Sequence, residues 1–129
     1  MTVLKKVLVV DDDPDILDQV EIVLKANGYD VAGVDSVAKA EEFLTATQPD
    51  LAIVDLMMEQ MDSGFVLCHE IKKLYPNVPI IMLTAVRAST GMSFDVNTPE
   101  AKSWIKADCI LDKPVRAEEL LNSVRKLLH

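Results

Sequence analysis

The chain has 129 residues, 50% of them apolar and 26% charged, and its formal net charge is −8 at neutral pH. This length suits one domain, which we expect to span residues 1–129 and to bury a core without disulfides or a structural metal. The composition excludes disorder as the main description, and the negative charge disfavours direct nucleic-acid binding, whose affinity comes largely from Lys and Arg. The apolar runs are far shorter than a membrane span and the N-terminus lacks a signal-peptide pattern, so we predict a cytoplasmic protein.

Short apolar runs alternate with amphipathic stretches along the chain, which is typical of βαβ units around a parallel sheet. The predicted strands are residues 6–10, 30–34, 51–54, 79–83 and 109–111. The predicted helices begin at Pro14, after Ser36, at Gly64, at Thr98 and at Ala117. Residues 86–97 show no clear period and are expected to form a long loop. This alternation predicts a doubly wound α/β fold, with a five-stranded parallel sheet and helices on both faces.

Several of these elements carry clear end signals. Asp13 is the predicted N-cap of the first helix, which Gly28 ends. Pro49 and Pro76 stop the second and third helices. The run 51–54 is continuously apolar, as a central strand covered by helices on both faces should be.

Polar side chains follow four of the predicted strands, at the point where each strand ends. They are Asp11, Asp12 and Asp13 after the first strand, Asp55 after the third, Thr84 after the fourth, and Asp112, Lys113 and Pro114 after the fifth. Because the carboxyl ends of parallel strands meet at one edge, where open α/β sheets bind ligands, we expect Asp11 or Asp12 to lie close to Asp55, with Thr84 and Lys113 at the neighbouring strand ends. Asp13 is expected to be only a helix cap and Asp112 a loop residue. Two carboxylates about 4 Å apart repel by roughly 4 kcal/mol at an effective dielectric of about 20. The cluster therefore needs a proton, a cation or Lys113 to compensate it.

A hard divalent ion with oxygen ligands is the expected compensator of this acidic cluster. Mg²⁺ fits better than Ca²⁺ or Zn²⁺, because the run 11–13 has neither EF-hand spacing nor zinc-type ligands. With such an ion, the Asp55 carboxylate can attack a phosphoryl group and form an acyl phosphate. Lys113 would pair with the phosphoryl oxygens, the Thr84 hydroxyl would donate to another of them, and Ala85 leaves a free backbone N–H nearby.

Four short stretches resemble the receiver domain of bacterial two-component response regulators. They are VVDDDP at residues 9–14, VDLMM at 54–58, LTA at 83–85 and KP at 113–114. The resemblance covers nearly the whole chain and implies a flavodoxin-like fold with strand order 2-1-3-4-5. It implies a phosphoacceptor domain of a phosphorelay, with self-phosphorylation and autodephosphorylation as its only activities. The donor would be a histidine kinase or a histidine phosphotransfer protein, and a downstream effector protein or domain would read the signal; a homodimer is left open.

The resemblance also implies roles for individual residues. The metal ligands would be Asp11 (through water), Asp12, Asp55 and the backbone carbonyl of Met57. The phosphate-binding and switch residues would be Thr84, Ala85 and Lys113. Asp55 would be the phosphoacceptor, and the peptide bond before Pro114 would be cis.

Several positions depart from the family pattern. Glu59 replaces the proline usual in its loop, and the region around residues 86–97 is several residues longer than in typical members. Ile110 is atypical, because the family's switch position holds an aromatic residue; we therefore expect the signal to leave through residues 86–97 or the helix after them. Met57 and Val86 are apolar where other members orient water, which predicts slow autodephosphorylation.

Two other functions stay open at this point. A receiver-like interaction module that is never phosphorylated would use the same fold as a docking surface. The intact acidic pair, Asp55, Thr84 and Lys113 argue against it, and the departures at Glu59 and Ile110 keep it open. An aspartyl-phosphate hydrolase of the haloacid dehalogenase type needs a second Asp two places after the nucleophile, where this chain has Met57. Phosphoryl uptake on Asp55 would exclude the first, and turnover of a phosphomonoester would revive the second.

Overall fold

The computed structural model describes residues 4–56, 63–84 and 107–128. Within these ranges the chain alternates strands and helices in the predicted order. The elements are β1 (Lys6–Val10), α1 (Pro14–Ala26), β2 (Asp30–Val34), α2 (Val37–Ala46), β3 (Leu51–Asp55), α3 (Ser63–Leu74), β4 (Ile80–Thr84), β5 (Cys109–Asp112) and α6 (Ala117–Leu127).

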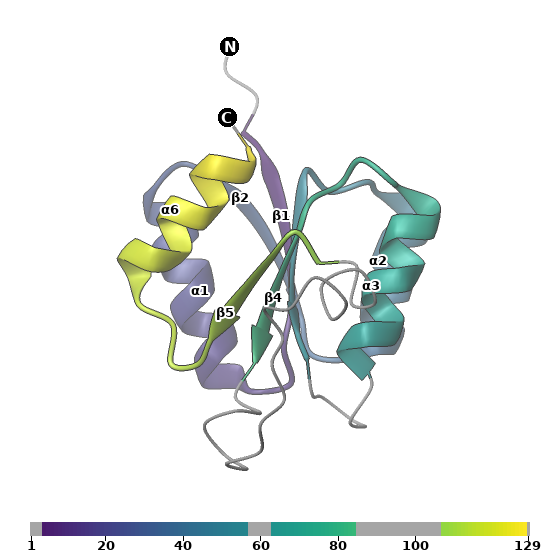
Figure 1. The fold of residues 1–129 in the computed structure, drawn as a ribbon, viewed down its shortest axis with the longest axis horizontal. Helices are drawn as coiled ribbons and strands as arrows, with labels where there is room; N and C mark the ends of the chain where they lie inside the picture. Colours follow the sequence, from purple (N-terminus) through teal and green to yellow (C-terminus); the bar gives the residue numbers. More distant parts are fainter. Residues whose placement is uncertain (1–3, 57–62, 85–106, 129) are drawn as a thin grey trace.

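The five strands form one parallel sheet in the order β2-β1-β3-β4-β5, which confirms the predicted order. Helices α1 and α6 cover one face of the sheet, and α2 and α3 cover the other (Figure 1). The strand order reverses at β1, which pairs with both β2 and β3. In doubly wound sheets, ligands bind outside the carboxyl ends of the strands at such a reversal.

Side chains of the central strands alternate between two apolar cores. Leu51 and Ile53 of β3 join the core beneath α1 and α6, whereas Ala52 and Val54 join the core beneath α2 and α3. All four are fully buried, and burying a side chain of the size of Val or Leu stabilises a fold by about 1.5–3 kcal/mol. β3 is therefore held from both faces, which keeps its carboxyl end in place.

The helix ends follow the predicted capping signals. The Asp13 side chain accepts a hydrogen bond from the Asp15 backbone N–H at 2.9 Å, at the start of α1. The Ser36 hydroxyl accepts one from the Lys39 backbone N–H at 3.2 Å, at the start of α2. Gly28 follows α1 with φ of +89°, a left-handed conformation that favours glycine.

Three strands end one residue later than predicted, and β4 also begins one residue later, at Ile80 rather than Pro79. The strands end at Asp55, Thr84 and Asp112. Their ladder continues because the backbone N–H groups of Leu56 and Lys113 still donate to the neighbouring strand, each at 2.8 Å. Helix α3 begins at Ser63, one residue early. The predicted loop 86–97 and the predicted helix from Thr98 lie outside the described residues.

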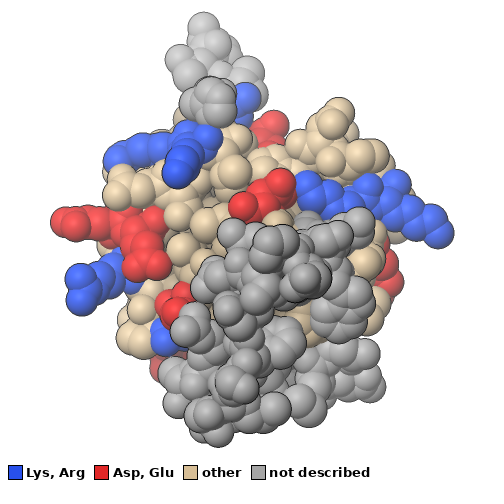
Figure 2. Space-filling model, viewed as in Figure 1, with Lys and Arg blue, Asp and Glu red and all other residues tan. Residues whose placement is uncertain are grey.

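The described surface carries mixed charge. On the face seen in Figure 2, Lys and Arg side chains form separate groups with Asp and Glu beside them, rather than one continuous basic surface. Across the parts of the chain that the structure describes, no helix has the length and apolar character needed to cross a bilayer.

Candidate functional site

Four neighbouring strands deliver polar side chains to one edge of the sheet. β3 ends in Asp55 and β4 in Thr84, while Asp11 directly follows β1 and Lys113 directly follows β5. These strands are adjacent and parallel, so their carboxyl ends lie side by side. The structure thus brings together the residues that the strand ends predicted.

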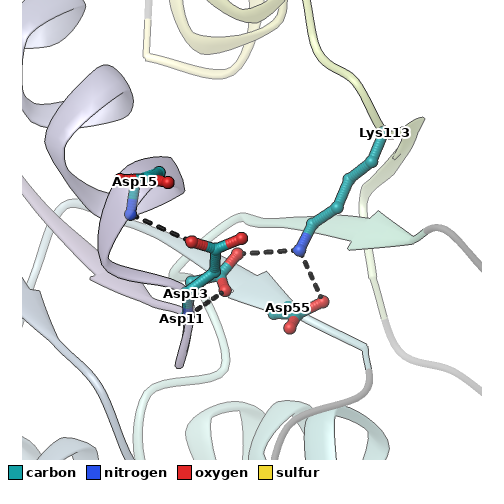
Figure 3. A network of polar contacts seen from close by, with 5 residues as sticks. All are labelled: Asp11, Asp13, Asp15, Asp55 and Lys113. Atoms are coloured by element: carbon teal, nitrogen blue, oxygen red, sulfur yellow. Dashed lines mark hydrogen bonds and ion pairs between the residues drawn. The ribbon is translucent and has the colours of Figure 1, made fainter.

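Lys113 bridges two of these carboxylates. Its Nζ lies 2.9 Å from Oδ2 of Asp11 and 3.2 Å from Oδ1 of Asp55 (Figure 3). Asp11 is fully buried, Asp55 is 5% exposed and the Lys113 side chain is 17% exposed. Charges this deep interact much more strongly than surface charges, so removing one partner of the bridge should destabilise the fold.

The same contacts determine how Lys113 titrates. Burial by itself would lower the pKa of Lys113, but the hydrogen bond to Asp11 and the charges of Asp55 and Asp11 outweigh it. The pKa of Lys113 is therefore raised above its usual value, and the side chain stays a cation throughout the physiological range.

The carboxylates also approach one another. Asp11, Asp12 and Asp55 each offer an oxygen, and these oxygens all lie within 4.8 Å of one another. We call Asp11, Asp12, Asp55 and Lys113 the carboxyl-edge cluster. One ammonium faces three carboxylates, so the cluster has an excess of negative charge. A set of oxygen-only donors with exposed Asp12 at its rim suits a hard divalent cation that keeps some of its water.

The local backbone orients Asp11. Its Oδ1 accepts a hydrogen bond from the Asp13 N–H at 2.9 Å, and its own N–H donates to the carbonyl of Val34 at 3.1 Å. Asp13 itself caps α1. The run of three Asp residues is thus divided between a buried carboxylate, an exposed one and a helix cap.

The β4 and β5 ends are tied together beside this cluster. The backbone N–H of Lys113 donates to the carbonyl of Thr84 at 2.8 Å, and Thr84 is 1% exposed. The peptide bond between Lys113 and Pro114 is cis, as the family resemblance implied. Met57 and Ala85, two further residues of the predicted site, lie outside the described part of the chain.

Ile110 occupies the position expected to be atypical. It lies in β5 opposite Met82 of β4, and it is half-buried against the core beneath α2 and α3. An aliphatic side chain thus stands at this position of β5, and its part in switching stays a prediction.

The close packing of Gly64 against the site was not predicted from the sequence, which marked this residue only as the start of a helix. Gly64 donates its backbone N–H to the carbonyl of Leu56 at 2.9 Å, and its Cα lies against the backbone of Asp55 and Leu56. The contact joins the carboxyl end of β3 to the first turn of α3. A glycine at a helix start was the only signal that the sequence offered for it.

The chain has clear relatives among characterised families and proteins. A family model described as the response regulator receiver domain matches residues 7–125. The chain is 35% identical over 127 residues to the DNA-binding dual master transcriptional regulator RpaA of Synechocystis sp., a match covering 95% of this chain and 48% of that protein. It is 32% identical over 127 residues to the DNA-binding response regulator MtrA of Mycolicibacterium smegmatis, covering 98% of this chain and 52% of that protein. The chain therefore spans about half the length of the curated relatives it matches.

Solved structures lead to the same family. A response regulator receiver domain protein (CheY-like) from Methanospirillum hungatei JF-1 superposes with a TM-score of 0.81 at 26% identity, covering 98% of this chain and 94% of that one. A response regulator receiver domain protein from Clostridium thermocellum superposes with a TM-score of 0.80 at 27% identity, covering 97% and 94%. Together with the family match and the strand order, these likenesses show that the chain belongs to the receiver domains of two-component response regulators.

Proposed function

We propose that Asp55 accepts a phosphoryl group from a histidine kinase or a histidine phosphotransfer protein, and that this switches a partner-binding surface. The observation that carries the proposal is the bridge from Lys113 to Asp11 and Asp55, at 2.9 and 3.2 Å. A lysine that holds a buried carboxylate at a sheet edge is placed to hold the phosphoryl group that this carboxylate would receive.

The proposed reaction is a nucleophilic displacement at phosphorus. A carboxylate oxygen of Asp55 attacks the phosphorus, the P–N bond to the donor histidine breaks, and its electron pair stays on the imidazole nitrogen. The Lys113 ammonium then pairs with the phosphoryl oxygens, and the Thr84 hydroxyl donates to another of them. In the proposed site, the Ala85 backbone N–H adds a further donor.

The metal proposed for this site is Mg²⁺. Asp11 (through water), Asp12 and Asp55 would hold it together with the backbone carbonyl of Met57. Their oxygen-only donor set and excess negative charge support this choice. When bound, the ion would neutralise charge that builds up on the transferred group.

The proposed setting is a single receiver domain, residues 1–129, in the cytoplasm. Receiver domains are regulatory, and we propose that the chain's own chemistry goes no further than self-phosphorylation and autodephosphorylation. The relatives that are named as DNA-binding regulators are about twice as long. We therefore propose that a downstream effector domain or protein reads the signal. The receiver domain itself would not contact nucleic acid. It would form a homodimer if its switched surface is self-complementary.

The experiment that tests the proposal is incubation with acetyl phosphate and Mg²⁺, followed by intact mass measurement. We expect a gain of about 80 Da, the mass of one phosphoryl group, which Asp55→Asn abolishes. Asp13→Asn is the matched control, because Asn still caps a helix and Asp13 lies outside the carboxyl-edge cluster. No gain with the native chain would instead support an interaction module that is never phosphorylated, the alternative that the departures at Glu59 and Ile110 keep open.

A further inference from the structure

The first turn of α3 lies directly against the end of β3. Besides the hydrogen bond from Gly64 to Leu56, a Cβ atom placed on Gly64 would lie 2.5 Å from Leu56 Cα and 2.6 Å from the Leu56 carbonyl oxygen. It would come closer still to the carbonyl oxygen of Asp55. All three are backbone atoms, so no flexible side chain can move aside.

The backbone conformation does not explain a glycine here. Gly64 is in the first turn of a regular helix, and its φ lies outside the left-handed region, unlike that of Gly28. Glycine is among the least favourable residues for a helix, so alanine would suit this position better by local preference alone. The close approach of α3 to the backbone of Asp55 and Leu56 is the feature that requires the missing side chain.

Both sides of this contact are anchored. Leu56 is 2% exposed, and its N–H donates to the carbonyl of Leu83 in β4 at 2.8 Å. On the other side, Leu67 and Ile71 hold α3 in the core with no exposed surface. A side chain at position 64 would therefore displace the Asp55 and Leu56 backbone, the first turn of α3, or both.

We propose that Gly64 is a positioning residue for Asp55. By leaving no Cβ between α3 and β3, it lets the Asp55 carboxylate sit where it reaches Lys113 at 3.2 Å and shares a 4.8 Å oxygen cluster with Asp11 and Asp12. This inference rests on the proposed function of Asp55. A shift of the acceptor by a fraction of an ångström matters, because a misplacement of about 1 Å can slow a reaction by roughly a hundredfold.

The test compares Gly64→Ala with Gly33→Ala. Gly33 lies in β2, and a Cβ there would crowd the tip of the Glu21 side chain, which is flexible, and would lie 3.6 Å from Leu17 Cδ2, an ordinary van der Waals contact. For both variants we would measure the rate of mass gain at saturating acetyl phosphate and Mg²⁺, the Kd for Mg²⁺ by calorimetry, and the free energy of unfolding in urea. Gly64→Ala should slow phosphoryl uptake by at least about tenfold and weaken Mg²⁺ binding several-fold, while Gly33→Ala stays within about twofold of the native chain on both.

A purely structural role would give a different result. It would lower the free energy of unfolding of Gly64→Ala but leave the uptake rate and the Mg²⁺ Kd of the folded variant at native values, which would overturn the proposal. If Gly64→Ala is largely unfolded, the measurements are repeated in trimethylamine N-oxide, which favours compact states. A variant that stays unfolded there would also overturn the proposal, because Gly64 would then be needed for the whole fold. If the native chain gains no mass, the proposed function fails, and the Mg²⁺ Kd alone decides the role of Gly64.

Discussion

Two lysines bridge acceptors at opposite edges of the same sheet, and their surroundings differ. At the amino ends of β4 and β5, Lys72 Nζ lies 2.8 Å from the carbonyl of Val78 and 2.9 Å from Oδ2 of Asp108. The same Asp108 oxygen accepts the backbone N–H of Ile80 at 2.8 Å. We call Lys72, Val78, Ile80 and Asp108 the amino-edge cluster. There, one ammonium meets one carboxylate and one neutral carbonyl.

The difference between the two clusters is one of charge balance. The amino-edge cluster is neutral overall and joins α3 to the starts of two strands, which is what a structural tie needs. The carboxyl-edge cluster sets three carboxylates against one ammonium, an arrangement that carries a cost until a cation compensates the excess negative charge. Two lysines with similar bridging geometry can therefore have different roles: Lys72 stabilises the fold at one edge, and Lys113 compensates the proposed phosphoacceptor site at the other.

The largest effect is expected from Lys113→Met. Removing the ammonium takes away the cation that faces buried Asp11 and Asp55, which should cost about 3–5 kcal/mol of unfolding free energy in the presence of EDTA. Phosphoryl uptake from acetyl phosphate should fall by about two orders of magnitude. Urea unfolding with and without Mg²⁺ measures the first effect, and Mg²⁺ should recover part of the loss. A stability loss below about 1 kcal/mol would show that the bridge matters little.

Lys72→Met tests the structural side of the comparison. Asp108 and the Val78 carbonyl each lose a partner, so we expect a loss of about 1–3 kcal/mol of unfolding free energy. This loss should not depend on Mg²⁺, and the rate of phosphoryl uptake should stay native. A slower uptake in this variant would mean that the two edges are coupled rather than separate.

Asp12→Asn tests the excess charge directly. Asp12 is exposed, so solvent screens its repulsion from Asp11 and Asp55, and the metal-free variant should gain at most a few tenths of a kcal/mol of unfolding free energy. Its Mg²⁺ affinity should drop by about tenfold, which removes about 1.4 kcal/mol of Mg²⁺-dependent stabilisation. Urea unfolding across a Mg²⁺ series measures this, with Asp13→Asn as the control. Equal Mg²⁺ dependence in the two variants would count against Asp12 as a ligand.

Glu70→Gln gives the smallest expected effect. It measures the cost of a second pair of like charges, Glu70 and Glu41, which lies outside the carboxyl-edge cluster. Burial, followed by the hydrogen bond and charge of Glu41, raises the pKa of Glu70 above its usual value. When the pKa of an acid is higher in the folded state than in the unfolded state, the folded protein loses stability as the pH rises. The loss begins near the unfolded-state pKa, about 4.3 for Glu, and is complete above the raised folded-state pKa. Glu70→Gln should therefore gain a few tenths of a kcal/mol near neutral pH and nothing below a pH of about 4. Urea unfolding at both pH values checks this, and a gain of the same size at both would contradict it.

Much of the architecture follows from local patterns. The strand at 51–54 was predictable because an uninterrupted apolar run must be covered on both faces, and its neighbours followed from the regular alternation. Parallel topology then brought Asp11, Asp55 and Lys113 to one edge without further assumption. Asp13 was correctly separated from this group as a helix cap, because Pro14 follows it.

Other features depend on contacts between distant segments. Lys72 and Asp108 are 36 positions apart, and either one alone is an ordinary charged residue of a helix or loop. From the sequence, Gly64 is predicted only to begin a helix, and its close contact with β3 appears only once α3 is packed on the sheet. The predicted strands stop one residue short of Asp55, Thr84 and Asp112, because a polar side chain is typical of a loop although the backbone ladder continues through it. The predictions for Glu59 and Val86 fall outside the described residues.

The most direct test of the central claim is to locate the phosphoryl group chemically. After incubation with acetyl phosphate and Mg²⁺, borohydride reduces an acyl phosphate in two steps. A first hydride adds to the carbonyl carbon and phosphate leaves, which gives an aldehyde; a second hydride and a proton from water then convert the aldehyde to the alcohol of homoserine. Peptide mass mapping then identifies the converted residue. The account predicts conversion at Asp55 and none at Asp11 or Asp12. Conversion at Asp11 or Asp12 with Asp55 intact, or no conversion at all, would contradict it.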